Sequence, residues 1–151
     1  MTPARSAFTL MELLVTMLLI ITILAFGVPA LFSSERKAGV SDGIRNLVNL
    51  HERAMKWQRL AAATGSGLVY QVTINSGSRT ASVTNSTLTN VSIDGDGVVA
   101  TITGAPGTIS YNTSTGFPSI ASPLSIVFKT TNSKYSRTLK IYPLGFTEDV
   151  Q

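Results

Sequence analysis

Residues 13–32 read L-L-V-T-M-L-L-I-I-T-I-L-A-F-G-V-P-A-L-F, and no charged side chain interrupts them. As an α-helix with a rise of about 1.5 Å per residue, this run extends about 30 Å, which matches the hydrocarbon thickness of a bilayer. A secretory signal is shorter and ends in small residues, whereas S-S-E-R-K follows here. The stretch therefore predicts a helix that stays in the membrane, with Gly27 and Pro29 kinking or loosening its last turns.

The composition agrees with a membrane segment joined to a weakly charged domain. Charged residues make up 13% of the chain, against about 25% in average soluble domains. The net charge of +4 permits a nucleic-acid partner without indicating one. The chain has no cysteine, which excludes disulfides, thiolate nucleophiles and cysteine-based metal sites.

Residues 33–63 continue the helical pattern but become amphipathic. Side chains at helical spacing define one apolar face, which consists of Val40, Ile44, Leu47, His51 and Met55. Most of the charged residues of this segment lie elsewhere around the helix. The run T-G-S-G at 64–67 is a helix stop signal. We expect the apolar face to pack on the part of the chain that follows.

From residue 64 onward, helical spacing gives way to short alternating runs between turn signals. The runs that we expect to form strands are 68–74, 79–84, 87–93, 98–103, 108–111, 124–130, 136–142 and 146–150. Such runs, rich in β-branched residues and separated by polar turns, are typical of antiparallel strands. The sequence thus predicts an α+β fold. A long N-terminal helix, transmembrane in its first half and amphipathic in its second, packs on a small antiparallel β-sheet domain.

One carboxylate, Glu12, lies near the start of the apolar run, where a charge is costly. An intramembrane acid costs roughly 2.5–3.5 kcal/mol at a helix centre on insertion scales, and less near an end. One interpretation is that Glu12 marks the membrane boundary and that its carboxylate reaches the headgroups. The other is that it has a functional partner, as intramembrane acids usually do.

The residues around Glu12 resemble the N-terminus of type IV pilins and type II secretion pseudopilins. After the short leader M-T-P-A-R-S-A, the chain reads F-T-L-M-E-L-L (Phe8–Leu14) and enters the long apolar run. The resemblance implies that a prepilin peptidase cuts between Ala7 and Phe8 and that Phe8 is then N-methylated. It also implies that Glu12 pairs with the new amino terminus of a neighbouring subunit. The family usually has Gly before the cut, and Ala7 departs from that pattern.

The resemblance implies a leader at residues 1–7, a transmembrane and filament-core helix at 8–32, an amphipathic helix at 33–63 and a β-rich domain at 64–151. The implied location is a bacterial inner membrane, crossed once, with the C-terminal domain in the periplasm before assembly into a periplasmic or surface filament. The implied partners are the prepilin peptidase, other pilins or pseudopilins, and the inner-membrane assembly platform.

Later stretches resemble the GspH/FimT group of minor pseudopilins and minor pilins. These stretches are H-E-R-A-M-K-W-Q-R-L at 51–60, L-V-Y-Q-V at 68–72 and R-T-L-K-I-Y-P-L-G at 137–145. The resemblance implies a structural minor subunit that initiates or extends a filament. Two alternatives stay open: a DNA-binding minor pilin of a competence pilus, and a bitopic membrane protein with a periplasmic β domain and no filament role.

For DNA binding, cations would have to neutralise phosphates. The tail G-F-T-E-D at 145–149 places two acids in the region where the DNA-binding alternative needs cations. Four cations lie in the preceding stretch, namely Lys129, Lys134, Arg137 and Lys140. The sequence therefore permits a basic patch, but we do not expect DNA to be the partner.

The remaining patterns carry little functional signal. D-G-D-G at 94–97 lacks the further oxygen ligands and distal Glu of a calcium loop, so we expect a tight turn. His51, on the apolar helix face, is expected to be packed rather than to bind a ligand. No nucleophile–base or carboxylate constellation is visible, so we expect no enzyme, cofactor or metal site. Sequons begin at Asn85, Asn90 and Asn112, as chance allows in a chain rich in Asn, Ser and Thr.

Overall fold

The computed structural model describes residues 9–131 and 134–150, apart from the side chains of residues 29 and 30. The helix is α1 (Leu10–Thr64). The strands are β1 (Gln71–Asn75), β2 (Thr80–Val83), β3 (Val91–Ser92), β4 (Val99–Thr103), β5 (Thr108–Ser110), β6 (Leu124–Thr130), β7 (Ser136–Ile141) and β8 (Thr147–Val150). The chain divides into two compact units, Met1–Glu35 and Arg36–Gln151, which are described in turn.

The first unit contains the N-terminal part of α1, and its large apolar side chains are exposed. Leu10 is 81% exposed and Phe26 is 77% exposed. The most apolar window of the helix has a mean hydropathy of 2.5, and none of it is buried. Thr16 and Thr22 donate their hydroxyls to the carbonyls of Leu13 and Leu18, at 2.9 and 2.7 Å. By length and composition, this helix can cross a membrane, as the sequence predicted.

The helical backbone is unbroken across Gly27 and Pro29, which both belong to α1. A proline inside a helix removes one backbone donor and often bends the helix. The bend expected at these two residues stays a prediction.

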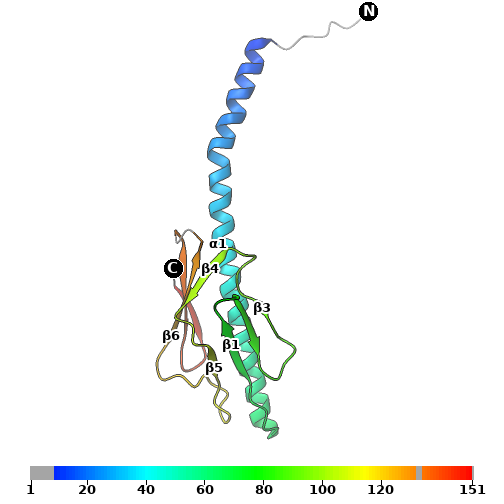
Figure 1. Cartoon of the computed structure of the whole chain (residues 1–151), viewed down its shortest axis with the longest axis vertical. Coiled ribbons are helices and arrows are strands. Elements are labelled where there is room, and N and C mark those ends of the chain that lie inside the picture. Colours follow the sequence, from blue (N-terminus) through cyan, green and yellow to red (C-terminus); the bar gives the residue numbers. More distant parts are fainter. Residues whose placement is uncertain (1–8, 132–133, 151) are drawn as a thin grey trace, which may run out of the picture. The chain divides into compact units, whose positions relative to one another are not determined.

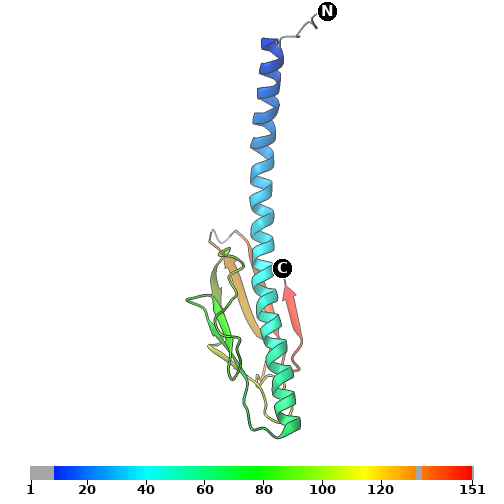
Figure 2. The ribbon, with the colours of Figure 1, turned by 90° about the vertical axis from the view of Figure 1, so that its right-hand side faces the viewer.

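In the second unit, the strands form two four-stranded antiparallel sheets where the sequence predicted one small sheet. Sheet A has the order β3-β2-β1-β5, and sheet B has the order β4-β6-β7-β8. In the two ribbon views, both sheets lie beside the part of α1 that belongs to this unit (Figures 1 and 2). The fold class is α+β, as predicted.

A single core joins the two sheets to α1. Along the strands, side chains alternate between buried and more exposed positions. The buried side chains come from both sheets, for example Val72 and Val83 in sheet A and Phe128 and Leu139 in sheet B. Val72 lies directly across from Val83 in the β1–β2 hairpin. All members of the core cluster lie between Val40 and Ile141. The first unit therefore contributes nothing to this core.

The buried face of α1 is wider than the sequence predicted. Val40, Ile44, Leu47 and His51 are buried as expected, whereas Met55 is only partly buried. Leu50, Gln58 and Ala61, which the predicted face does not include, are also buried, and so is Ala54, which was predicted to flank that face. The core takes side chains from α1 and from both sheets, so the buried stripe of the helix is wider than one row of side chains.

The end of α1 agrees with the predicted stop. Gly65 has a positive φ of 62°, and its N–H donates to the carbonyl of Ala62 at 3.4 Å. The N–H of Ser66 donates to the carbonyl of Ala61 at 3.2 Å. These two bonds form a Schellman motif, in which a glycine in the left-handed conformation ends the helix.

Candidate assembly surfaces

Glu12 lies in the first turn of α1 and forms a capping box with Thr9. Its Oε2 accepts hydrogen bonds from the N–H and from the hydroxyl of Thr9, both at 3.4 Å. In return, the N–H of Glu12 donates to the hydroxyl oxygen of Thr9 at 3.2 Å. The sequence signature of this motif is T-x-x-E, and residues 9–12 read T-L-M-E. The sequence analysis overlooked this second role of Glu12.

The capping box gives the Glu12 carboxylate a stabilising role within its own chain. A negative charge beside the N-terminus of a helix interacts favourably with the helix dipole, and the carboxylate satisfies a backbone donor there. Glu12 therefore has a partner within its own chain. Ala7 and Phe8, the residues predicted to flank the cleavage, lie outside the described residues.

His51 is packed, as the sequence predicted, and it connects α1 to Tyr111, which follows β5, and to Gly145, in the turn between β7 and β8. Its Nε2 lies 3.1 Å from the carbonyl oxygen of Gly145, and its Nδ1 lies 2.8 Å from the hydroxyl of Tyr111. Because a carbonyl only accepts, Nε2 donates and Nδ1 accepts from Tyr111. Burial lowers the pKa of His51, although the Gly145 carbonyl and the charge of Glu52 act in the opposite direction. Neutral His51 is thus fully hydrogen-bonded.

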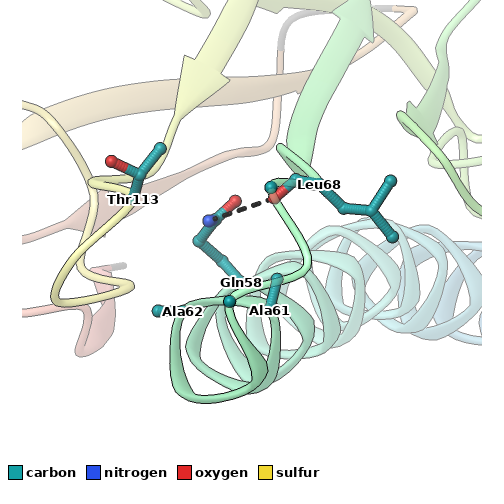
Figure 3. A pocket seen from close by; sticks show the side chains of 7 residues that line it. Gln58, Ala61, Ala62, Leu68 and Thr113 are labelled. Atoms are coloured by element: carbon teal, nitrogen blue, oxygen red, sulfur yellow. Dashed lines mark hydrogen bonds between the residues drawn. The ribbon is translucent and has the colours of Figure 1, made fainter.

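Gln58 is a buried polar residue that the sequence analysis did not single out. Its Oε1 accepts a hydrogen bond from the N–H of Tyr70 at 2.8 Å, and its Nε2 donates to the carbonyl of Leu68 at 3.5 Å. Figure 3 shows Gln58 beside Ala61 and Ala62 on α1, with its amide directed at the Leu68 backbone. These bonds explain why β1 begins at Gln71 and not at Leu68. The Leu68 carbonyl and the Tyr70 N–H bond to the Gln58 side chain, and the Val69 carbonyl accepts from Nδ2 of Asn85 at 2.8 Å, instead of pairing with a strand.

The hollow in Figure 3 lies at the end of α1. It has a volume of about 250 Å³ and is lined by Gln58, by small residues of the helix end, by Leu68 and by Thr113. Ligand pockets usually enclose about 300–1,000 Å³ and contain several convergent polar groups. Among the described residues, no group of three or more His, Cys, Asp or Glu side chains could hold a metal ion.

The acidic run at 94–97 forms a turn, as predicted. The hydroxyl of Ser92 donates to Oδ1 of Asp94 at 2.5 Å, and this bond lowers the pKa of Asp94. The carbonyl of Asp94 accepts from the N–H of Val99 at 2.8 Å. The polar groups of Asp94 thus support the entry to β4.

Two of the four cations considered for a DNA-binding patch are paired with the acids of β8. Nη2 of Arg137 lies 2.5 Å from Oδ2 of Asp149, and Nζ of Lys140 lies 3.9 Å from Oε2 of Glu148. The residues come from the adjacent strands β7 and β8, where Lys140 faces Glu148 directly. These ion pairs reduce the positive charge that this face could offer to phosphates.

Large apolar side chains are exposed in two places among the described residues of the second unit. The helix-end patch surrounds the junction of α1 and β1 and consists of the exposed Leu60, Leu68 and Val69 and the half-buried Trp57 and Tyr70. The turn patch lies on the connection between β7 and β8 and consists of the exposed Leu144 and Phe146 and the half-buried Tyr142. Exposed apolar patches on a folded domain often mark contact sites.

These observations define a class of protein with one long N-terminal helix. The first part of the helix is apolar, and its second part packs on antiparallel sheets. That arrangement is compatible with a pilin-like fold. No family model, curated protein or solved structure matches the chain.

Proposed function

We propose that this protein is a minor pilin or minor pseudopilin, a structural subunit of a type IV pilus or a type II secretion pseudopilus. In this proposal, a prepilin peptidase cuts between Ala7 and Phe8, and the subunit assembles through the apolar part of α1. The observation that carries the proposal is the position of Glu12. It follows F-T-L-M and caps a helix whose apolar side chains are exposed.

The exposed apolar surface of the first unit supports the proposal. A helix that is apolar on all sides needs a lipid or protein environment. A bilayer supplies that environment before assembly, and the apolar helices of neighbouring subunits supply it in a filament. In a filament, the carboxylate of Glu12 would be desolvated, so pairing it with the Phe8 amino group of a neighbour would select one axial offset.

The first test is the mature N-terminus. We expect mass spectrometry of the protein isolated from its own cells to give a chain that begins at N-methylated Phe8. A chain that keeps Met1, or that starts at another residue, would contradict the processing step.

The second test separates the two roles of Glu12. Glu12→Gln removes the charge but keeps a side chain that can complete a capping box. Thr9→Ala removes the capping partner but keeps the charge. We expect Glu12→Gln to lower incorporation into filaments at least tenfold, because an uncompensated amino group is left in the apolar core.

Thr9→Ala is the matched control and should assemble at close to the normal level. Both variants should insert into membranes as the unchanged chain does. Equal assembly of Glu12→Gln and the unchanged chain would exclude the pairing role. Failure of the unchanged chain itself to enter a filament would favour a bitopic membrane protein without a filament.

A further inference from the structure

Four cations gather at the end of the second unit where α1 enters it. This basic end consists of Arg36, Lys37, Lys129 and Lys134. Arg36 and Lys37 are exposed on α1, Lys134 is exposed on the connection between β6 and β7, and Lys129 is half-buried near the end of β6. None of the four forms an ion pair with another residue that the structure describes. Their charge is therefore free to attract an anion from outside the chain.

A pocket joins the helix side of the basic end to the strand side. It has a volume of about 330 Å³ and is lined by Arg36, Gly97, Val98, Thr130 and Thr131. Both ribbon views show this end of sheet B beside α1 (Figures 1 and 2). A guanidinium can donate two parallel hydrogen bonds to one phosphate, and the exposed Thr131 adds a hydroxyl. The pocket thus has the size and the donors for a small group that carries a phosphate.

The position of Arg36 and Lys37 in the chain selects a lipid as the source of that phosphate. They follow Phe32, the last residue of the uncharged run, by four and five residues in one continuous helix. This separation corresponds to a rise of about 6–8 Å. The polar headgroup region of a bilayer is about 5–8 Å thick on each side. When the run crosses the hydrocarbon core, both cations therefore lie at the depth of the headgroups.

The balance of charge at this end favours an anionic lipid. Two acids are exposed there, Glu35 directly before Arg36 and Asp96 directly before Gly97, against the four cations. Each Lys or Arg near an anionic membrane surface strengthens association about fivefold, and the effect falls off within a Debye length of about 10 Å. Lys56 is also exposed, but it follows Lys37 by a rise of about 29 Å along the helix, beyond that range.

We propose that the basic end binds the phosphate headgroups of anionic lipids on the side of the membrane where the apolar run ends, with one headgroup in the pocket of Arg36. The lipid is a phosphodiester with a net negative charge, such as phosphatidylglycerol. The contact holds the connection between β6 and β7 against the membrane surface. It requires only a helix that crosses the membrane, so it goes beyond the proposed filament function and does not depend on it.

Native mass spectrometry of the full chain in an uncharged detergent tests the pocket. We expect phosphatidylglycerol to bind at least about tenfold more tightly than phosphatidylcholine, because only the former keeps a net negative charge beside the cations. Arg36→Gln should weaken the binding of phosphatidylglycerol by about tenfold and leave that of phosphatidylcholine unchanged. Lys56→Gln removes one positive charge farther along α1, and this matched control should bind as the unchanged chain does.

Lysine footprinting of the unchanged full chain in vesicles tests the surface contact. The reagent is an uncharged polyethylene glycol ester that reacts with amines and does not cross membranes. We expect Lys134 to react several-fold more slowly in vesicles that contain phosphatidylglycerol than in vesicles of phosphatidylcholine alone. Lys56 is the internal control and should react at the same rate in both. This readout needs no variant, so it does not depend on the folding of Arg36→Gln.

Four outcomes would overturn the proposal. The first is equal binding of phosphatidylglycerol and phosphatidylcholine. The second is full displacement of phosphatidylglycerol by inorganic phosphate at the same concentration, which would show a site for free anions. The third is displacement of the lipid by a short DNA duplex, which would assign the cations to nucleic acid. The fourth is a rate of modification of Lys134 that is the same in both kinds of vesicle.

Discussion

At the scale of single residues, Glu12 has one partner in the described structure and would have a second only in the proposed filament. In the described structure, it caps α1 through Thr9. In the proposed filament, it pairs with the Phe8 amino group of a neighbour. The T-L-M-E pattern was sufficient to predict the cap, because the capping box depends only on residues three positions apart. The second partner belongs to another chain, and only the resemblance of Phe8–Leu14 to the pilin N-terminus implies it.

The pH dependence of stability is a prediction at the same scale. His51 is the only histidine, and burial lowers its pKa in the folded protein. The unfolded chain then binds a proton below pH 6.5 that the folded chain does not bind. The contribution of neutral His51 to the free energy of unfolding is present in full above pH 6.5. It is lost as the pH falls toward the pKa of His51 in the folded protein.

We expect the free energy of unfolding to fall by at most about 1.4 kcal/mol per pH unit between pH 6.5 and 5. Urea unfolding at a series of pH values measures it. In the His51→Gln variant, the free energy of unfolding should be nearly independent of pH in this window, because ordinary carboxylates titrate lower. The same slope in both proteins would exclude His51 as the cause.

At the scale of elements, α1 and the connection between β3 and β4 approach each other through glycines. A side chain added at Gly95 would overlap the carbonyl of Gly39, and one added at Gly43 would overlap the carbonyl of Ile93. From the sequence, Gly39 and Gly43 were predicted only to weaken the start of the amphipathic helix. Glycine favours close backbone approach, which offsets its lower helix propensity.

Gly95→Ala tests this contact. We expect it to destabilise the protein by about 1–3 kcal/mol beyond the cost of a positive φ, because packed backbone must move. Gly97→Ala is the matched control, since Gly97 also has a positive φ but faces open space. Thermal or urea unfolding compares the two variants. Equal losses of stability would mean that the backbone conformation, and not the contact, requires glycine at residue 95.

At the scale of the whole molecule, the folding core and the apolar segment belong to different units. Every residue of the core cluster lies in Arg36–Gln151. The large apolar side chains of the first unit are exposed within the described chain, so they need an apolar environment outside it. The two units are therefore suited to different environments, as the proposed filament subunit would require.

A fragment that comprises Arg36–Gln151 tests this division. We expect it to be soluble and to unfold in one cooperative transition by circular dichroism. Leu47→Ala should then lower its stability by about 2–5 kcal/mol, because Leu47 is fully buried in the core. Leu60→Ala removes the same atoms at an exposed position and should change stability by less than about 1 kcal/mol. A fragment without a cooperative transition would mean that the first unit is needed for folding.

The sequence by itself determined the apolar helix, its amphipathic continuation, the stop at T-G-S-G and most strands, because these depend on neighbouring residues and local periodicity. Only the tertiary structure decided that the strands divide into two sheets. β1 pairs with β5, and β4 pairs with β6, so each sheet contains a pair of strands that are not neighbours in the sequence. Tertiary packing also decided that Gln58 is buried and that Leu68 and Leu144 stay exposed. Their burial depends on which surfaces meet, and the alternation of polar and apolar residues along one chain does not contain that information.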